Sequence, residues 1–161
     1  MAEEFQLTQE MKDAIGVESE PHTVELDKTA VRMFARAVGY TDPVFYDEAE
    51  AKRRGFRSLP APPGYLGTPI FNPRATAPGV GDQQGGRRFS NPFKRVLNGG
   101  TEIEYVGDIC AGDALTVRSK IADLKPARGS LGQMLITTNE STYHNQDGKL
   151  VAIMRGTIIN Y

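Results

Sequence analysis

The chain has 161 residues, a formal net charge of −1 at pH 7 and 24% charged residues. Its length suits one domain with a substantial core, and its near-neutral charge excludes a strong general attraction to nucleic acid or to a membrane surface. The single cysteine, Cys110, excludes an internal disulfide and a thiolate metal site. No signal-peptide or membrane-spanning pattern is present, so we expect a cytoplasmic protein without metal or cofactor.

The first third of the chain predicts short helices around one strand. Residues 7–16 form a helix with Thr8 as N-cap, and residues 21–26 alternate as a strand. Asp27 caps a second helix that ends at Gly39. The apolar positions of this helix recur at helical spacing: Ala30, Val31, Phe34, Ala35 and Val38. After an Asp-Pro turn, "DEAEAKRRG" predicts a third helix.

The character of the sequence changes after Leu59. "LPAPPGYLGTPIF" is apolar but holds four prolines, so at most a short helix begins near Pro63 or Gly64. Residues 72–95 lack periodicity and predict a long loop. The last third is rich in β-branched residues, and "NQDGK" marks a hairpin. We expect an antiparallel meander and an α+β fold, with strands in the following ranges: 99–106, 113–124, 132–145 and 149–161.

The motifs "FARAVGYTDPVFYDEAEA", "APP" and "AGDALTV", in this order and spacing, resemble those of the MaoC-like hot-dog hydratases. Within this family, the chain resembles more closely the N-terminal half of the double hot-dog (R)-specific enoyl-thioester hydratases and dehydratases. The resemblance implies a single hot-dog domain over residues 1–161, in which an antiparallel sheet wraps a central helix starting near "PPGYLGTPIF". It also implies that two such units pair along their sheets.

Active members of this family carry a D-x-N-P-x-H loop, whose Asp and His act on one water molecule. On this chain the Asp position is Tyr40, the Asn position is Asp42, the Pro position is Pro43 and the His position is Phe45. Phe45 cannot transfer a proton, and a tyrosine with an ordinary pKa of ~10 is a poor base near neutral pH. We therefore expect the loop to keep its shape without its catalytic pair. His22 and His144, the two histidines of the chain, lie elsewhere.

The resemblance implies a non-catalytic subunit of a heteromeric enoyl-CoA hydratase or 3-hydroxyacyl-thioester dehydratase. A second hot-dog chain with the D-x-N-P-x-H loop would supply the dyad, and the isolated chain could form a homodimer. Two alternatives stay open: a self-sufficient hydratase or thioesterase that uses Asp47 or Glu48, and a module that binds acyl-CoA without catalysis. The thioester could be carried by coenzyme A or by an acyl carrier protein.

Several residues are candidates for substrate contact. Gly64 could offer a backbone N–H to the thioester oxygen if a helix begins there. Basic side chains on the long loop could meet the phosphates of coenzyme A or an acidic carrier protein. Side chains near the central helix would set the depth of the acyl channel. The basic candidates are Arg87, Arg88, Lys94 and Arg95, and the channel candidates are Tyr65, Leu66, Ile70 and Phe71.

Overall fold

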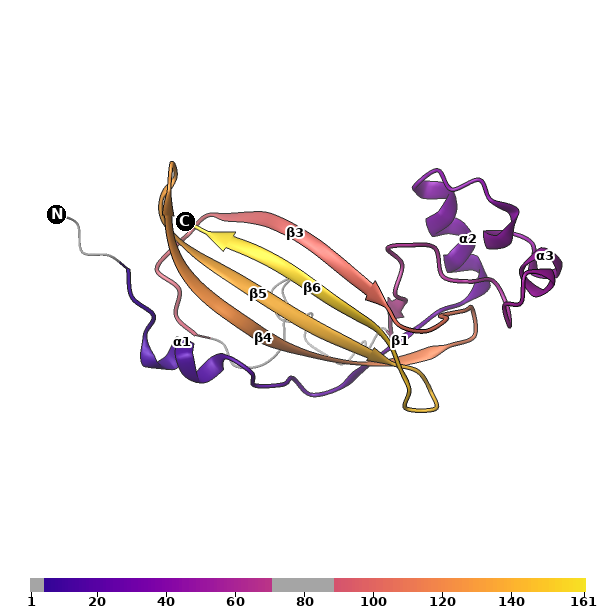
Figure 1. Cartoon of the computed structure of the whole chain (residues 1–161), viewed down its shortest axis with the longest axis horizontal. Helices are drawn as coiled ribbons and strands as arrows, with labels where there is room; N and C mark the ends of the chain where they lie inside the picture. Colours follow the sequence, from indigo (N-terminus) through magenta and orange to yellow (C-terminus); the bar gives the residue numbers. More distant parts are fainter. Residues whose placement is uncertain (1–4, 71–88) are drawn as a thin grey trace.

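The computed structural model describes residues 5–70 and 89–161, which form a curled antiparallel sheet with helices at its two ends (Figure 1). The sheet order is β2-β1-β4-β5-β6-β3, and each pairing is antiparallel. The strands are β1 (His22–Glu25), β2 (Thr68–Pro69), β3 (Val96–Tyr105), β4 (Ala114–Gly129), β5 (Gly132–His144) and β6 (Leu150–Asn160).

The meander prediction is correct for β4, β5 and β6 but wrong for β3, which pairs with β6 instead of β4. Residues 106–113 carry the chain across the end of the sheet. They are held there by backbone hydrogen bonds from Val106 to Val151, from Ala111 to Leu59 and from Gly112 to Leu26. As a result β3 is an edge strand whose outer backbone groups have no strand partner among the described residues.

The helices of the first third begin where the sequence predicts. In α1 (Gln9–Ala14), α2 (Lys28–Ala37) and α3 (Glu48–Arg53), the N-cap side chains of Thr8, Asp27 and Asp47 accept hydrogen bonds from backbone N–H groups of the first turn. In Figure 1, α2 and α3 lie beyond one end of the sheet and α1 lies at the other. No described helix is both long and apolar enough to cross a membrane.

The helix expected to begin near Pro63 is absent from the described residues. The chain instead makes a turn, in which the Tyr65 N–H donates to the Pro62 carbonyl at 2.9 Å and Gly64 has a φ of +94°. It then extends into β2, where Pro69 pairs with Val24. Pro69 cannot donate to a ladder, so it suits this short edge strand. Phe71, Arg87 and Arg88 lie outside the described residues, as does the loop prediction for residues 72–88.

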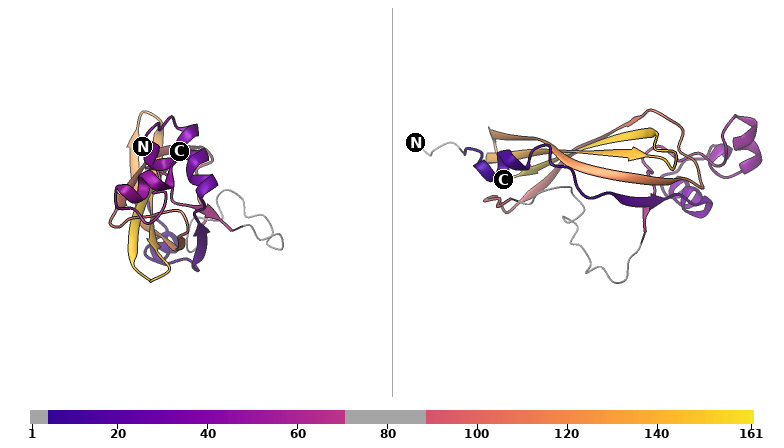
Figure 2. Two further views of the ribbon diagram at one scale, coloured as in Figure 1. Left: turned by 90° about the vertical axis from the view of Figure 1, so that its right-hand side faces the viewer. Right: turned by 90° about the horizontal axis from the view of Figure 1, so that it is seen from below.

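Two apolar clusters occupy the two ends of the sheet's inner face. The first lies beside α2 and includes Val31, Leu59 and Leu115, each fully buried. The second lies at the other end, where Met11 of α1 packs with Leu135 and other side chains. The stretch of inner face between the two clusters is not covered by a described helix. The views along the other axes show the long strands spanning this distance (Figure 2).

The buried carboxylate of Asp113 forms hydrogen bonds with three connecting segments of the chain, at the end of the sheet beside α2. Both oxygens of Asp113 accept hydrogen bonds of 2.8 Å from the Arg57 guanidinium, and the Cys110 N–H and the Gln146 amide also donate to it. The Asp113 side chain is 1% exposed. This network fixes the segment that leads to Gly64 against the β3–β4 connection and the β5–β6 hairpin.

Candidate functional site

The loop of residues 40–47, here called the motif loop, keeps the turn that the sequence predicts. The Asp42 side chain accepts from the Val44 N–H at 3.0 Å and pairs with Arg54 at 2.9 Å, so that it starts the 3₁₀ turn Pro43–Phe45. The backbone hydrogen bond, followed by the contact with Arg54, lowers the pKa of Asp42 below its usual value. Asp42 is therefore a structural residue held as a carboxylate.

The two positions that would hold a catalytic dyad form an aromatic pair instead. The rings of Tyr40 and Phe45 lie 5.7 Å apart between centroids, and the Tyr40 hydroxyl is 3.5 Å from the Pro63 carbonyl oxygen. Phe45 also lines a small apolar depression of about 360 Å³ between the motif loop and the end of β3. This arrangement places hydrocarbon where an imidazole would act, so the motif loop has no side-chain acid–base pair.

The backbone amide of Gly64 is already engaged. Its N–H donates to the Tyr105 hydroxyl at 2.8 Å, and Tyr105 comes from the end of β3. Gly64 lies in a turn and not at a helix start, so the reason for expecting a thioester-oxygen donor there does not hold. Two of the parts that the family's chemistry requires, a proton-transfer pair and a free amide, are thus missing from this end of the described chain.

The carboxylates that follow the motif loop belong to the start of α3. Asp47 accepts from the Ala49 N–H at 2.8 Å as the helix cap. Glu48 forms ion pairs with Lys28 and Lys52, and these contacts lower its pKa. A lowered pKa makes a carboxylate a weaker base, which counts against Glu48 as the base of a self-sufficient enzyme.

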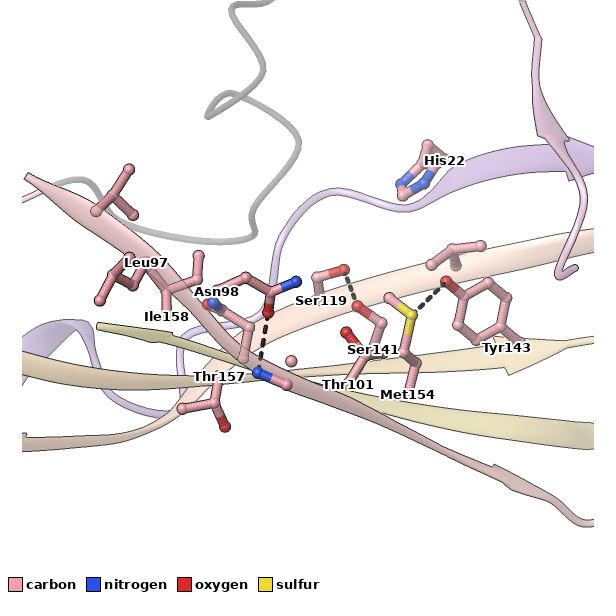
Figure 3. A pocket seen from close by; sticks show the side chains of 15 residues that line it. His22, Leu97, Asn98, Thr101, Ser119, Ser141, Tyr143, Met154, Thr157 and Ile158 are labelled. Atoms are coloured by element: carbon pink, nitrogen blue, oxygen red, sulfur yellow. Dashed lines mark hydrogen bonds between the residues drawn. The ribbon is translucent and has the colours of Figure 1, made fainter. Parts of the chain in front are cut away.

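A cavity of about 560 Å³ lies on the inner face of the sheet, between the two apolar clusters (Figure 3). His22 reaches toward it from β1, while Ser119, Ser141 and Met154 face it from β4, β5 and β6. Gly156 lies opposite Asn139 in the wall, and a Cβ built there would meet no atom within 4 Å. The other lining residues are Val96, Leu97, Asn98, Gly100, Thr101, Val117, Tyr143, Thr157 and Ile158.

The described residues that the sequence predicted to line the acyl channel or to bind anionic groups do not line this cavity. Tyr65 and Leu66 are each 8% exposed and belong to the apolar cluster beside α2, where the Tyr65 ring stacks on Phe34 at 5.3 Å. Lys94 and Arg95 precede β3, whose opposite end carries Tyr105. The ten residues of β3 separate them from Gly64 by about 30 Å. Arg95 lies over the Tyr161 ring, 5.9 Å from its centroid.

Sequence reasoning missed the residues that line the cavity. Ser119 lies on β4 between the inward-facing Val117 and Ile121, so its hydroxyl stands where the period of two predicts hydrocarbon. Ser141 lies on β5 between Asn139 and Tyr143, so it gives no such signal. Their meeting depends on the β4–β5 register, which sets Ser119 directly opposite Ser141. His22, which lies outside the motif loop, lines the same cavity, whereas His144 lies at the end of β5 and does not line it.

The curled six-stranded sheet and the dehydratase-type loop without its dyad define a hot-dog protein of the hydratase and dehydratase class. The chain belongs to the family of FAS1-like dehydratase domain regions, whose model matches residues 13–154. This match, together with the similar proteins below, confirms the resemblance to MaoC-like hot-dog proteins and the α+β hot-dog fold class.

Two similar sequences illustrate the relationship. A UPF0336 protein of Streptomyces griseus is 33% identical over 127 residues, which cover 79% of this chain and 78% of that protein. A probable enoyl-CoA hydratase alpha subunit of Thermomonospora curvata is 26% identical over 141 residues, which cover 81% of this chain but only 43% of that protein.

Two similar structures are complexes from Mycobacterium tuberculosis. A chain of the ChsH1–ChsH2 complex has a TM-score of 0.68 and 19% identity, with 89% of this chain and 84% of that chain covered. A chain of the C-terminally truncated HadBC (3R-hydroxyacyl-ACP dehydratase) complex has a TM-score of 0.66 and 20% identity, with 92% and 98% covered. At these identities the likeness concerns the fold.

Proposed function

We propose that this chain is the non-catalytic subunit of a heteromeric (R)-specific enoyl-thioester hydratase or 3-hydroxyacyl-thioester dehydratase. The observation that carries the proposal is the pairing of Tyr40 with Phe45 at the two dyad positions. The engagement of the Gly64 amide by Tyr105 supports it, because it removes a donor for the thioester oxygen. A second hot-dog chain with a D-x-N-P-x-H loop supplies the Asp and the His.

The role of this subunit is to shape the acyl channel. The inner-face cavity of about 560 Å³ has the size of a small-molecule site, and hydrocarbon from Val117, Met154 and Ile158 forms much of its wall. The side-chain-free position at Gly156 keeps the wall open in the middle of β6. The acyl group, carried on coenzyme A or on a carrier protein, extends into this cavity while its thioester reacts at the partner's dyad.

The partner pairs along β3. This edge strand is exposed over nearly all of its ten residues, and its ends carry exposed apolar side chains that a partner would cover. Those side chains are Val96, Leu97, Tyr105 and Val106. The similar structures titled as ChsH1–ChsH2 and HadBC complexes are each assemblies of two proteins, which supports a two-chain arrangement here. Isolated chains could use the same edge to form a homodimer.

The test is an enoyl-CoA hydration assay that follows loss of the conjugated thioester absorbance. The purified chain is assayed alone, then with a co-expressed hot-dog chain that carries the D-x-N-P-x-H loop. We expect turnover only in the mixture, and none when the His of the partner's motif is replaced by Ala. The Thr142→Ala variant of this chain, on the outer face of β5, serves as the matched control and should behave as wild type.

Other results would favour the alternatives. Turnover by the chain alone, lost in Asp47→Asn or Glu48→Gln, would overturn the proposal and establish a self-sufficient enzyme. Acyl-CoA that protects the chain against thermal unfolding, with no turnover in any mixture, would instead identify a binding module.

A further inference from the structure

The middle of the cavity wall is polar, although the two ends of the inner face are apolar. Five residues, here called the polar belt, provide this character: His22, Thr101, Ser119, Asn139 and Ser141. The strand register sets Ser119 opposite Ser141, and it sets Asn139 and Thr101 on either side of Gly156. Figure 3 shows the two serine hydroxyls pointing toward one another beneath His22. A purely alkyl ligand gives these groups no partner.

The two serines hold hydrogen-bonding capacity that the described chain does not use. Ser119 and Ser141 are 6% and 8% exposed, and their hydroxyl oxygens lie 2.7 Å apart. Two hydroxyls have two donor protons, and this contact uses one of them, which leaves one O–H and several lone pairs. Among the described residues the Asn139 side chain makes no hydrogen bond either. The Tyr143 hydroxyl, beside them, contacts the Met154 sulfur at 4.0 Å.

The belt holds no carboxylate, ammonium or guanidinium group. None of the described residues that line the cavity is an Asp, Glu, Lys or Arg. Burial raises the pKa of Tyr143, which keeps its hydroxyl protonated. A carboxylate or phosphate beside the buried Ser119–Ser141 pair would lose hydration without gaining a lysine or arginine side chain among the described lining residues, at a cost in free energy. A hydroxyl or a carbonyl can be satisfied by serine and asparagine side chains.

The belt also has a defined depth. His22 lies opposite Val117, in the row of Ala152, which pairs with Tyr105 at the end of the sheet near Gly64. The other four belt residues lie along β6 in the rows of Met154 and Gly156. Met154 and Gly156 are two and four residues from Ala152 along β6, which corresponds to about 7 and 13 Å from the end of the sheet near Gly64. Apolar side chains lie on both sides of these four residues, with Val117 on one side and Ile158 on the other. A ligand that fits this pattern has an oxygen well inside a hydrocarbon body or at its far end.

We propose that this cavity selects acyl groups that carry an uncharged hydroxyl or carbonyl oxygen along their hydrocarbon body or at its far end, and that the Ser119–Ser141 pair binds this oxygen. The inference rests on the proposed function, because it assigns the substrate class of the same acyl channel. It goes further in excluding simple alkyl chains as the preferred ligand and in excluding acyl groups with a terminal carboxylate.

The experiment compares three ligands of similar length by calorimetric titration of the chain and of its complex with the partner. They are decanoyl-CoA, a decanoyl-CoA with a hydroxyl at its far end, and decanedioyl-CoA, which ends in a carboxylate. We expect the hydroxylated ligand to bind about three- to tenfold more tightly than decanoyl-CoA, as one additional hydrogen bond provides. The dicarboxylic ligand should bind most weakly.

The Ser119→Ala/Ser141→Ala double variant should lose the preference for the hydroxylated ligand while still binding decanoyl-CoA. Thr142→Ala, on the outer face of the same strand, should retain the preference. Circular dichroism and the melting temperature verify that both variants fold. If the double variant does not fold, Ser141→Thr, which keeps the hydroxyl and adds a methyl to the cavity, should weaken binding of all three ligands together.

The outcomes separate this inference from the proposed function. Equal affinity of the wild-type chain for decanoyl-CoA and its hydroxylated form would overturn the inference and leave the subunit role intact. A preference that survives in the double variant would overturn the assignment to Ser119 and Ser141. Binding of none of the three, together with no turnover alongside the partner, would overturn the proposed function itself.

Discussion

The backbone amide of Gly64 donates its hydrogen to the Tyr105 hydroxyl at 2.8 Å. One residue comes from the turn after the motif loop and the other from the end of edge strand β3, so the contact joins two segments 41 residues apart in sequence. A hydroxyl oxygen thus occupies the place that a substrate oxygen would take if this amide polarised a thioester. The inactivity expected of this chain therefore has two separable causes, the missing dyad and the occupied amide.

Restoring the dyad tests the first cause. We expect the Tyr40→Asp/Phe45→His variant to stay nearly inactive alone, because the Gly64 amide remains occupied by Tyr105. Adding Tyr105→Phe should free the amide and give measurable enoyl-CoA hydration by the chain without a partner. Proton transfer of this kind contributes about 10²- to 10⁴-fold to a rate. Tyr105→Phe alone is the control and should give no turnover; equal activity of the double and triple variants would show that the amide plays no part.

Filling the cavity tests the acyl channel. Gly156→Val places two methyl groups in open space on a strand position that suits a β-branched residue. We expect the complex to keep its rate on short enoyl-CoA substrates and to lose at least tenfold in kcat/KM on long ones. The matched control is Thr142→Val, on the outer face of β5. A uniform loss at every chain length would contradict the channel assignment.

Introducing charge at the edge strand tests the pairing with a partner. Leu97→Glu and Val106→Glu place carboxylates at opposite ends of β3, where both residues are exposed in the single chain. Each should leave the melting temperature of the isolated monomer unchanged and weaken association with the partner at least tenfold, as measured by analytical ultracentrifugation. Leu131→Glu, on an equally exposed residue in the β4–β5 turn, is the control and should pair normally.

The Asp113 network makes a prediction about stability. Asp113→Ala leaves Arg57 and the Cys110 N–H without their acceptor, so we expect a loss of about 2–3 kcal/mol in the free energy of unfolding. Asp113→Asn should cost less, because an amide oxygen can still accept one of these bonds. Urea denaturation of both variants at neutral pH measures the difference, and equal stability of Asp113→Ala and wild type would contradict it.

The same carboxyl predicts a pH dependence. Burial acts to raise the pKa of Asp113, but the hydrogen bonds from Arg57, Cys110 and Gln146 outweigh it and hold the pKa below the ordinary value of 3.8. A lowered pKa stabilises the fold at pH values above 3.8, and the contribution disappears as the pH falls through the folded-state pKa. Between pH 5 and pH 3 the wild-type chain should therefore lose more stability than Asp113→Asn. Parallel loss in both would assign the acid sensitivity to other groups.

Much of the fold could be predicted from the sequence because its signals are local. Thr8 and Asp27 cap their helices as expected, and the hairpin forms at Gly148, which has a φ of +73°. The pairing of β3 with β6 could not be predicted, because the period of two shows which residues of a strand share a face but not which strand it pairs with. Likewise, an apolar segment that starts with Pro62 and Pro63 fits a helix start or a turn equally well.

The candidate site was predictable only in part. The loss of the dyad at Tyr40 and Phe45 follows directly from residue identity, whatever the fold. The Gly64–Tyr105 contact and the Ser119–Ser141 pair depend on tertiary pairing between segments that are distant in sequence, so no local pattern contains them. The sequence also placed Lys94 and Arg95 near the substrate by their charge alone, while the structure sets them at the far end of β3 from Gly64.

At Gly156 the cavity wall carries no side chain, and a Cβ built there would meet no atom within 4 Å. A single base change in a glycine codon can produce alanine or valine, and either would shorten the accessible channel without disturbing the strand. Under the proposed function, the length of the acyl group that this subunit accepts would therefore change with one residue, while the sheet, the caps and the Asp113 network stay as they are. If the proposed function holds, the residue aligned to Gly156 in a related chain would indicate whether that chain accepts long or short acyl groups.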